Sequence, residues 1–188
     1  MSARPSQIQP AHKPPEPVVL ATRTALKLNV RPVRAEDEPV QRRLFDRVTP
    51  ADLRYRFLSS MRHVDHARLD AMIHVDYDRT ITFIAFDPSG EPVASSMFVG
   101  DEDRIEGEVA ISVRSDLKGL GIGWAMLQHV IGYARSAGFA RVRSLESRAN
   151  IDTVELEQEQ GFTLHSCSDD PTEIVATIET GQSGTARV

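Results

Sequence analysis

The segment from Glu106 to Trp124 constrains the fold of this chain more than any other, because an alternating stretch runs directly into a glycine-rich turn. Apolar residues alternate with polar or small ones up to Val113, which predicts a β-strand with one buried face. Three glycines at alternate positions come next: Gly119, Gly121 and Gly123. An apolar stretch with helical spacing follows them. The segment therefore predicts a strand, a tight turn and a helix whose first N–H groups can point at an anion such as a phosphate.

Two common phosphate-binding motifs do not match these glycines. The dinucleotide-binding pattern G-x-G-x-x-G needs a glycine three residues after its second one, and Trp124 or Met126 stands there, depending on which pair is taken first. A P-loop ends in Gly-Lys-Ser/Thr, whereas Lys118 precedes the glycines. A strand-to-helix turn that binds no ligand is the remaining alternative.

Composition excludes several classes of protein. A chain of 188 residues is expected to form one domain. The net charge of -5 and the lack of a Lys/Arg-rich run argue against a nucleic-acid-binding protein. No apolar run approaches the ~20 residues of a membrane-spanning helix, and the single cysteine, Cys167, excludes an internal disulfide. The six histidines form no metal-ligand pattern. We expect a cytoplasmic protein without a metal or a membrane partner.

Two tails are expected around the domain. Five prolines fall within residues 1–17, where apolar periodicity is nearly absent. We predict a disordered, proline-rich tail over residues 1–24, a folded domain over residues 25–180, and a flexible tail over residues 181–188.

Strands and helices are expected to alternate between these tails. Period-two patterns predict strands at residues 26–33, 80–86, 91–99, 104–113, 140–145, 162–165 and 173–178. Helical spacing predicts helices at residues 36–48, 50–57, 69–73, 122–137 and 151–160, with Thr49 as an N-cap and Pro50 as a first helical residue. Short connections among the second, third and fourth strands predict an antiparallel meander.

The stretch from Lys118 to Gly123 resembles the Gln/Arg-x-x-Gly-x-Gly/Ala signature of the GNAT superfamily of acetyl-CoA-dependent N-acetyltransferases. Lysine departs from the first position of the signature, but the family uses a backbone amide there. The order of predicted elements is also similar to the GNAT fold. The resemblance implies an α/β (α+β) fold with a mixed, mostly antiparallel central sheet of about seven strands, flanked by helices.

Shorter strings narrow the resemblance. The sequence Asp76-Tyr77-Asp78-Arg79, the glutamate Glu108 and the stretch 113–119 are similar to the catalytic domain of bacterial protein lysine acetyltransferases that modify acyl-CoA synthetases. This implies acetyl transfer from acetyl-CoA to a protein lysine, for example of an acyl-CoA synthetase. Acetylation of a small-molecule amine and a non-catalytic, acyl-CoA-binding regulatory domain are the alternatives.

The resemblance also assigns acetyl-CoA to particular residues. The pantetheine arm is expected beside residues 109–113, where backbone N–H groups polarise the thioester carbonyl. The expected acetyl-CoA-binding residues are Ile111, Ser112, Val113, Lys118, Gly119, Leu120, Gly121, Ile122, Gly123, Trp124 and Asn150. Asn150 resembles the asparagine that opens the next helix in this family and contacts the pantetheine arm. A plain helix N-cap is the alternative for Asn150.

Acetylation of a lysine also requires a base, because its amine has a pKa of ~10.4 and is mostly protonated at pH 7. Glu108 is the expected general base, since it stands where the subfamily has its glutamate. Glu106 lies two residues away on the same strand face and competes for the role, and a solvated strand residue is the further alternative for Glu108. Glu157 stands where many family members have a tyrosine that protonates the leaving thiolate, so no general acid is assigned. Asp76 and Asp78 either attract a cationic lysine or form a turn.

Overall fold

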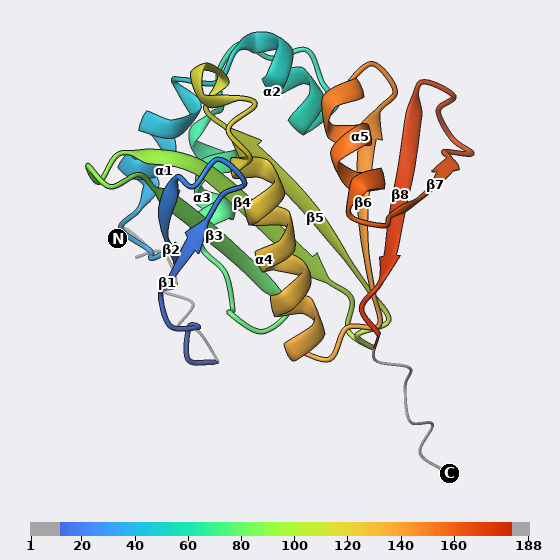
Figure 1. Cartoon of the computed structure of the whole chain (residues 1–188), viewed down its shortest axis with the longest axis horizontal. Coiled ribbons are helices and arrows are strands. Elements are labelled where there is room, and N and C mark those ends of the chain that lie inside the picture. The colour runs from blue at the N-terminus through green and yellow to red at the C-terminus, as the bar shows by residue number, and fades with distance from the viewer. Residues whose placement is uncertain (1–11, 182–188) are drawn as a thin grey trace, which may run out of the picture.

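The computed structural model describes residues 12–181. Its centre is a sheet of eight strands in the order β1-β2-β3-β4-β5-β6-β8-β7 (Figure 1). The strands are β1 (Val18–Ala21), β2 (Lys27–Pro32), β3 (Thr80–Phe86), β4 (Pro92–Gly100), β5 (Glu106–Val113), β6 (Arg141–Ser147), β7 (Thr163–Ser166) and β8 (Glu173–Glu179). Every neighbouring pair is antiparallel except β5 and β6, which are parallel. The mixed, mostly antiparallel sheet and the meander β3-β4-β5 are therefore confirmed.

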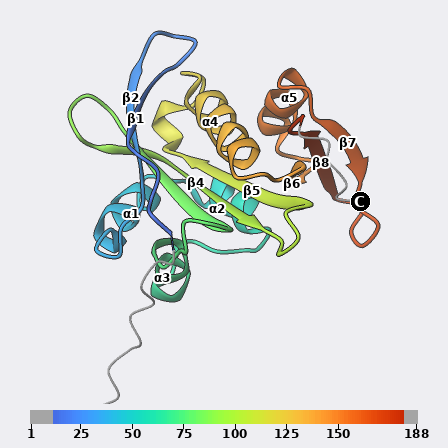
Figure 2. The same cartoon turned by 90° about the horizontal axis from the view of Figure 1, so that it is seen from below.

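Five α-helices cover the two faces of the sheet. They are α1 (Glu38–Phe45), α2 (Pro50–Phe57), α3 (His66–Ile73), α4 (Ile122–Ser136) and α5 (Ile151–Glu159). Figure 2 shows α1, α2 and α3 on one face and α4 and α5 on the other. The Thr49 side chain accepts a hydrogen bond from the N–H of Asp52, and Pro50 opens α2, as the sequence predicts. Within residues 12–181, no helix has the length and apolar character needed to cross a lipid bilayer.

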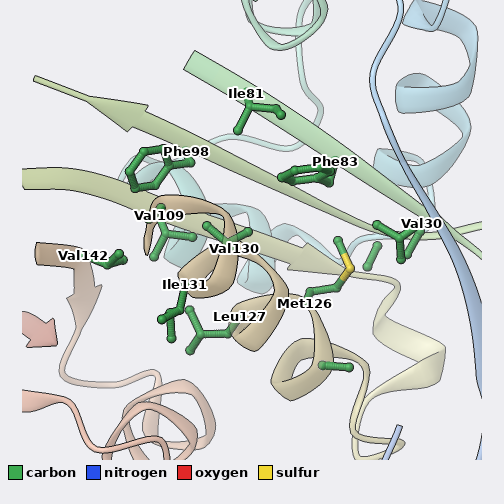
Figure 3. Packing of buried hydrophobic residues seen from close by; sticks show 14 of the residues in the cluster. Val30, Ile81, Phe83, Phe98, Val109, Met126, Leu127, Val130, Ile131 and Val142 are labelled. Atoms are coloured by element: carbon green, nitrogen blue, oxygen red, sulfur yellow. The ribbon is translucent and has the colours of Figure 1, made fainter. Parts of the chain in front are cut away.

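The main hydrophobic core lies between the sheet and α4. Met126 and Val130 of α4 are completely buried and pack in one cluster with Phe83, Phe98 and Val109 (Figure 3). Residues at spacings of three and four face the sheet, so the helical periodicity of the sequence determines which face of α4 is buried. This packing fixes the start of α4 against the end of β5.

The N-terminal limit of the domain differs from the prediction. Residues 18–21, which were assigned to the tail, form β1 and pair with residues 27–30 of β2. β1 lies at the edge of the sheet and exposes most of its side chains, with Val19 66% exposed, while Leu20 is partly buried against the main core. One partly buried side chain leaves no alternating pattern in the sequence, so the strand is defined mainly by its backbone pairing with β2. This strand makes the sheet eight-stranded instead of about seven-stranded. The predicted tails over residues 1–11 and 182–188 lie outside the described residues.

Candidate active site

The parallel pair β5 and β6 opens into a V-shaped gap. The two strands pair only at their first residues, Glu106 with Arg141, Gly107 with Val142 and Glu108 with Arg143. Beyond this point β5 pairs only with β4, and β6 only with β8. Figure 1 shows the two strands diverging toward α2 and α5. Backbone groups on the inner sides of the gap are therefore free to bind a ligand.

A cavity of about 540 Å³ occupies this gap. Its walls are residues 109–113 of β5, the glycine turn, the end of β6, and parts of α2, α5 and the β1–β2 connection. The volume falls in the usual range for small-molecule sites. The cavity wall includes residues of α4 and α5 on one face of the sheet and residues of α2 on the opposite face.

The glycine turn has the backbone conformation that the sequence predicts. Gly119 and Gly121 both have φ of +77°, a value that L side chains rarely adopt. Gly121 is the N-cap of α4, so the free N–H groups of Ile122 and Gly123 begin at the cavity wall. A Cβ at Gly119 would meet no atom within 4 Å, which leaves open space at the turn for a ligand. These features fit a bound diphosphate.

The structure adds detail on two other residues of the turn, Gly123 and Lys118. A Cβ at Gly123 would make ordinary contacts, the nearest at 3.5 Å with Leu156, so its helical position does not itself require glycine. Lys118 forms an ion pair with Asp52 of α2. The turn is thereby tied to the helix on the opposite face of the sheet.

The predicted strand and asparagine residues also lie at the cavity. Ile111, Ser112 and Val113 all line it. The side-chain oxygen of Ser112 is buried and has no hydrogen-bond partner among the described residues. Asn150 is the N-cap residue of α5, but its side chain makes no capping bond. Its Nδ2 donates instead to Oε2 of Glu146 at 3.0 Å, so a plain N-cap does not describe it.

The structure places Glu108 outside the cavity wall. Its carboxylate lies 2.8 Å from Nη2 of Arg143 on β6, and its side chain is 46% exposed. Glu106 lies 3.5 Å from the same arginine and 3.6 Å from Arg141. The two strand glutamates thus belong to a row of ion pairs where β5 and β6 still pair.

Four glutamates lie in the cavity wall, and two of them have strongly raised pKa values: Glu146 at the end of β6 and Glu157 on α5. Burial raises the pKa of Glu146 to about 7, although the hydrogen bond from Asn150 and the charge of Arg56 oppose the rise. Burial and the neighbouring charge of Glu146 raise the pKa of Glu157 to about 8. Carboxyl groups with such pKa values are neutral or easily protonated near pH 7, which suits proton transfer.

Glu157 has an unpartnered oxygen, and the cation Arg56 lies in the same cavity wall. Oε1 of Glu157 accepts a hydrogen bond from the Ser144 hydroxyl, but its buried Oε2 has no partner among the described residues. Glu157 is only 2% exposed. Arg56 of α2 also lines the cavity, and burial lowers its pKa to about 10. The sequence offers one signal for Glu146 and Glu157, which lie four residues before and seven residues after Asn150. Their burial, however, depends on the gap between β5 and β6.

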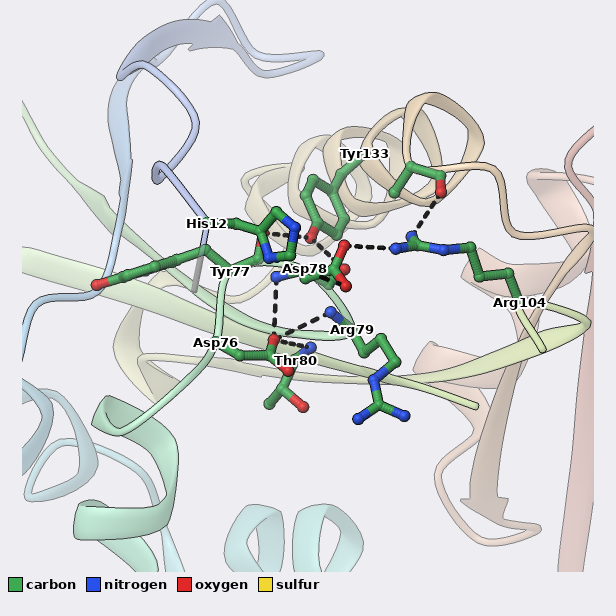
Figure 4. Close-up of polar contacts among 9 residues, drawn as sticks. His12, Asp76, Tyr77, Asp78, Arg79, Thr80, Arg104 and Tyr133 are labelled. Carbon is green, nitrogen blue, oxygen red and sulfur yellow. Dashed lines mark hydrogen bonds and ion pairs between the residues drawn. The ribbon is translucent and has the colours of Figure 1, made fainter. Parts of the chain in front are cut away.

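The two aspartates before β3 have structural roles. Asp76 accepts hydrogen bonds from the N–H groups of residues 78, 79 and 80, and Asp78 pairs with Arg104 at 2.5 Å (Figure 4). The hydroxyl of Tyr133 on α4 donates to the carbonyl oxygens of residues 77 and 78. This cluster is not part of the cavity wall. The turn interpretation therefore describes Asp76 and Asp78.

Comparison with known proteins identifies the family. Residues 46–162 match the model of the family described as Acetyltransferase (GNAT) family. The chain belongs to the GNAT acetyltransferase family. It is 30% identical to Acetyltransferase PA5475 of Pseudomonas aeruginosa over 149 aligned residues. The alignment covers 78% of this chain and 80% of that protein. The chain is therefore an acetyl-CoA-dependent acetyltransferase, and acetyl-CoA is its co-substrate.

Two solved structures share the GNAT fold with this chain. The GNAT domain of S. lividans PAT superposes with a TM-score of 0.81 at 20% identity, covering 87% of this chain and 96% of that one. A cAMP-binding acyltransferase from Mycobacterium smegmatis gives a TM-score of 0.60 at 22% identity, covering 88% of this chain and 47% of that one. At these identities the likeness shows the GNAT fold alone. Among residues 12–181, no group of three or more His, Cys, Asp and Glu side chains is placed to hold a metal ion.

Proposed function

We propose that the chain transfers the acetyl group of acetyl-CoA to a lysine side chain of a cytoplasmic protein, such as an acyl-CoA synthetase. The observation that carries amine acetylation is a carboxyl group with a pKa of about 7, Glu146, in a cavity that also contains the glycine turn. The protein-lysine acceptor is supported by the sequence strings around Asp76, Glu108 and residues 113–119.

The reaction joins the amine nitrogen to the thioester carbonyl carbon and breaks the C–S bond, so CoA leaves as a thiolate. Making a lysine amine neutral at pH 7 costs about 4.6 kcal/mol from its ordinary pKa. A carboxylate within reach of the amine lowers this cost by taking the proton. The departing sulfur accepts a proton in turn, and the amide and free CoA are the products.

We propose a glutamate as the general base, and two residues compete for the role. The resemblance assigns Glu108, which lies on the same strand face as the cavity residue Ala110 but pairs with Arg143. Geometry favours Glu146, because it lines the cavity and its pKa of about 7 matches neutral pH, whereas Glu108 lies outside the cavity wall and is paired with Arg143.

The acceptor class is tested by free CoA release from acetyl-CoA. The assay compares a purified acyl-CoA synthetase, a lysine peptide cut from it, and a panel of polyamines and aminoglycosides. We expect CoA to be released fastest with the synthetase as acceptor. Mass spectrometry should then locate the acetyl group on a lysine of the synthetase. Faster turnover of a small amine would reject the protein acceptor. Acetyl-CoA binding without turnover of any acceptor would favour a regulatory domain.

The base is tested with matched amide variants. Replacing the true base by glutamine should lower turnover by roughly 10²–10⁴-fold at pH 7, with acetyl-CoA affinity preserved. The loss should shrink at high pH, where the free amine is abundant. We expect this behaviour for Glu146→Gln and a smaller loss for Glu108→Gln, with Glu106→Gln as the control. The reverse order would return the role to Glu108.

A further inference from the structure

The connection between β1 and β2 packs directly on the glycine turn. The hydroxyl of Thr24 donates to the carbonyl oxygen of Leu120 at 2.9 Å. A Cβ at Gly121 would lie 3.2 Å from the backbone nitrogen of Arg23. The connection is itself ordered, because the hydroxyl oxygen of the buried Thr22 accepts hydrogen bonds from the N–H groups of Thr24 and Leu26. The tip of this hairpin is therefore held at the N-terminus of α4.

The side chain of Arg23 extends from this tip across the first turn of α4. Its guanidinium carbon lies 4.3 Å from the ring centroid of Trp124, in a cation–π contact. One guanidinium nitrogen lies 2.6 Å from a carboxylate oxygen of Glu159, at the end of α5. Arg23, Trp124 and Glu159 all line the cavity, and the side chain of Arg23 is 51% exposed. The cation therefore stands beside the turn and in contact with solvent.

The charges of the cavity wall show why the position of Arg23 beside the glycine turn matters. The wall contains six acidic and three basic residues. The nucleotide end of acetyl-CoA carries a diphosphate and a ribose 3′-phosphate, whereas the end of a helix supplies only about half a positive charge. Lys118 is paired with Asp52, and the charges nearest to Arg56 are those of Glu146 and Glu108. Among the described cations of the wall, Arg23 lies beside the glycine turn and has a partner, Glu159, that is itself more than half exposed and can be displaced by phosphate.

We propose that Arg23 is a phosphate-binding residue for the nucleotide end of acetyl-CoA, presented by the β1–β2 hairpin. The proposal rests on the acetyl-CoA dependence of the proposed function. A planar guanidinium can donate two parallel hydrogen bonds to one phosphate group while its face stays on Trp124. The exposed pair with Glu159 is weak, so a phosphate can displace that carboxylate. The hairpin precedes residues 46–162, so it adds a contact outside the segment that matches the family.

The test measures dissociation constants by calorimetry for the parent protein, Arg23→Gln, Glu159→Gln and the control Arg42→Gln, an exposed arginine paired with Glu38 on α1. Each is titrated with acetyl-CoA, acetyl-3′-dephospho-CoA and acetylpantetheine, which carries no phosphate; the weak binding of acetylpantetheine is followed by ligand-observed NMR. Arg23→Gln should weaken acetyl-CoA binding by about 10- to 100-fold, as expected for hydrogen bonds between charged groups. Glu159→Gln should strengthen it by about 2- to 5-fold, because it removes a competing anion.

The three ligands identify the phosphate. A loss confined to acetyl-CoA assigns Arg23 to the 3′-phosphate, and an equal loss with acetyl-3′-dephospho-CoA assigns it to the diphosphate. Parent-like affinity of Arg23→Gln for acetyl-CoA, or an equal loss with acetylpantetheine, overturns the proposal. If the parent protein does not bind acetyl-CoA, the proposed function fails as well. If the parent binds and only Arg23→Gln is without effect, the inference about Arg23 alone is rejected.

Discussion

Glu157→Gln should stabilise this protein at neutral pH. Glutamine has nearly the shape of a protonated glutamic acid, and its side-chain oxygen can still accept the hydrogen bond from Ser144. It carries no charge at any pH, whereas Glu157 must either ionise inside the cavity wall or hold a proton. The substitution therefore removes a free-energy cost of folding that the parent protein bears only above about pH 4.5.

The size of this cost follows from the pKa of Glu157, which rises from its ordinary 4.5 to about 8 on folding. Below pH 4.5 the carboxyl is protonated in both states, so it imposes no penalty. As the pH rises through 4.5 the unfolded chain loses this proton while the folded protein keeps it, and stability falls until the folded group also ionises near pH 8. At pH 7 the penalty is about 3 kcal/mol, at 1.36 kcal/mol per pH unit.

Thermal unfolding from pH 5 to pH 8 tests this reasoning, with Glu155→Gln on the exposed face of α5 as the control. For a domain of this size, about 3 kcal/mol corresponds to a rise in Tm of roughly 6–12 °C at pH 7. The difference between Glu157→Gln and the parent should decrease steadily toward pH 5. An equal difference at every pH, or a variant that is less stable than the parent at pH 8, would refute the argument.

Three further substitutions probe the turn and the core. Gly121→Glu should abolish acetyl-CoA binding in calorimetry, because it places a side chain and a negative charge where phosphate must approach; unchanged affinity with an intact fold would contradict the site. Gly107→Ala should cost about 1–3 kcal/mol in denaturant unfolding, since its Cβ would lie 2.0 Å from the ring of Phe98, whereas Gly132→Ala meets no atom within 4 Å and should not destabilise. Tyr133→Phe should cost about 1 kcal/mol in the same assay, because two carbonyl oxygens lose their donor.

Most of the fold could be predicted because its elements bury one face. The strands β3, β4 and β5 and the helix α4 bury residues at regular spacings, and their connections are short enough to define the meander. β1 was not predicted because it is held mainly by backbone pairing with β2, and Leu20 is the one of its four residues that is partly buried. An edge strand of this kind leaves little hydrophobic pattern in a sequence.

Only those parts of the candidate site that are continuous in the sequence could be predicted. The three glycines of the turn and residues 111–113 are local features of the sequence, and all of them line the cavity. The roles of the glutamates depend instead on where β6 separates from β5. Glu108 precedes the separation and therefore meets Arg143 across a paired strand, whereas Glu146 follows it and faces the cavity. No pattern within either strand reveals where their pairing ends.

We propose that Glu157 serves proton transfer, because its buried position is costly for a residue that only lines a binding cavity. A buried carboxyl whose Oε2 has no hydrogen-bond partner among the described residues reduces stability at neutral pH, and an apolar residue of similar size would avoid that cost. Binding of the pantetheine arm alone would gain little from such a group. Together with Glu146, it gives the cavity two carboxyls that exchange protons close to neutral pH, which is what a reaction that moves a proton from an amine and supplies one to a thiolate requires. We propose that stability is given up at this place because the chemistry needs a proton there.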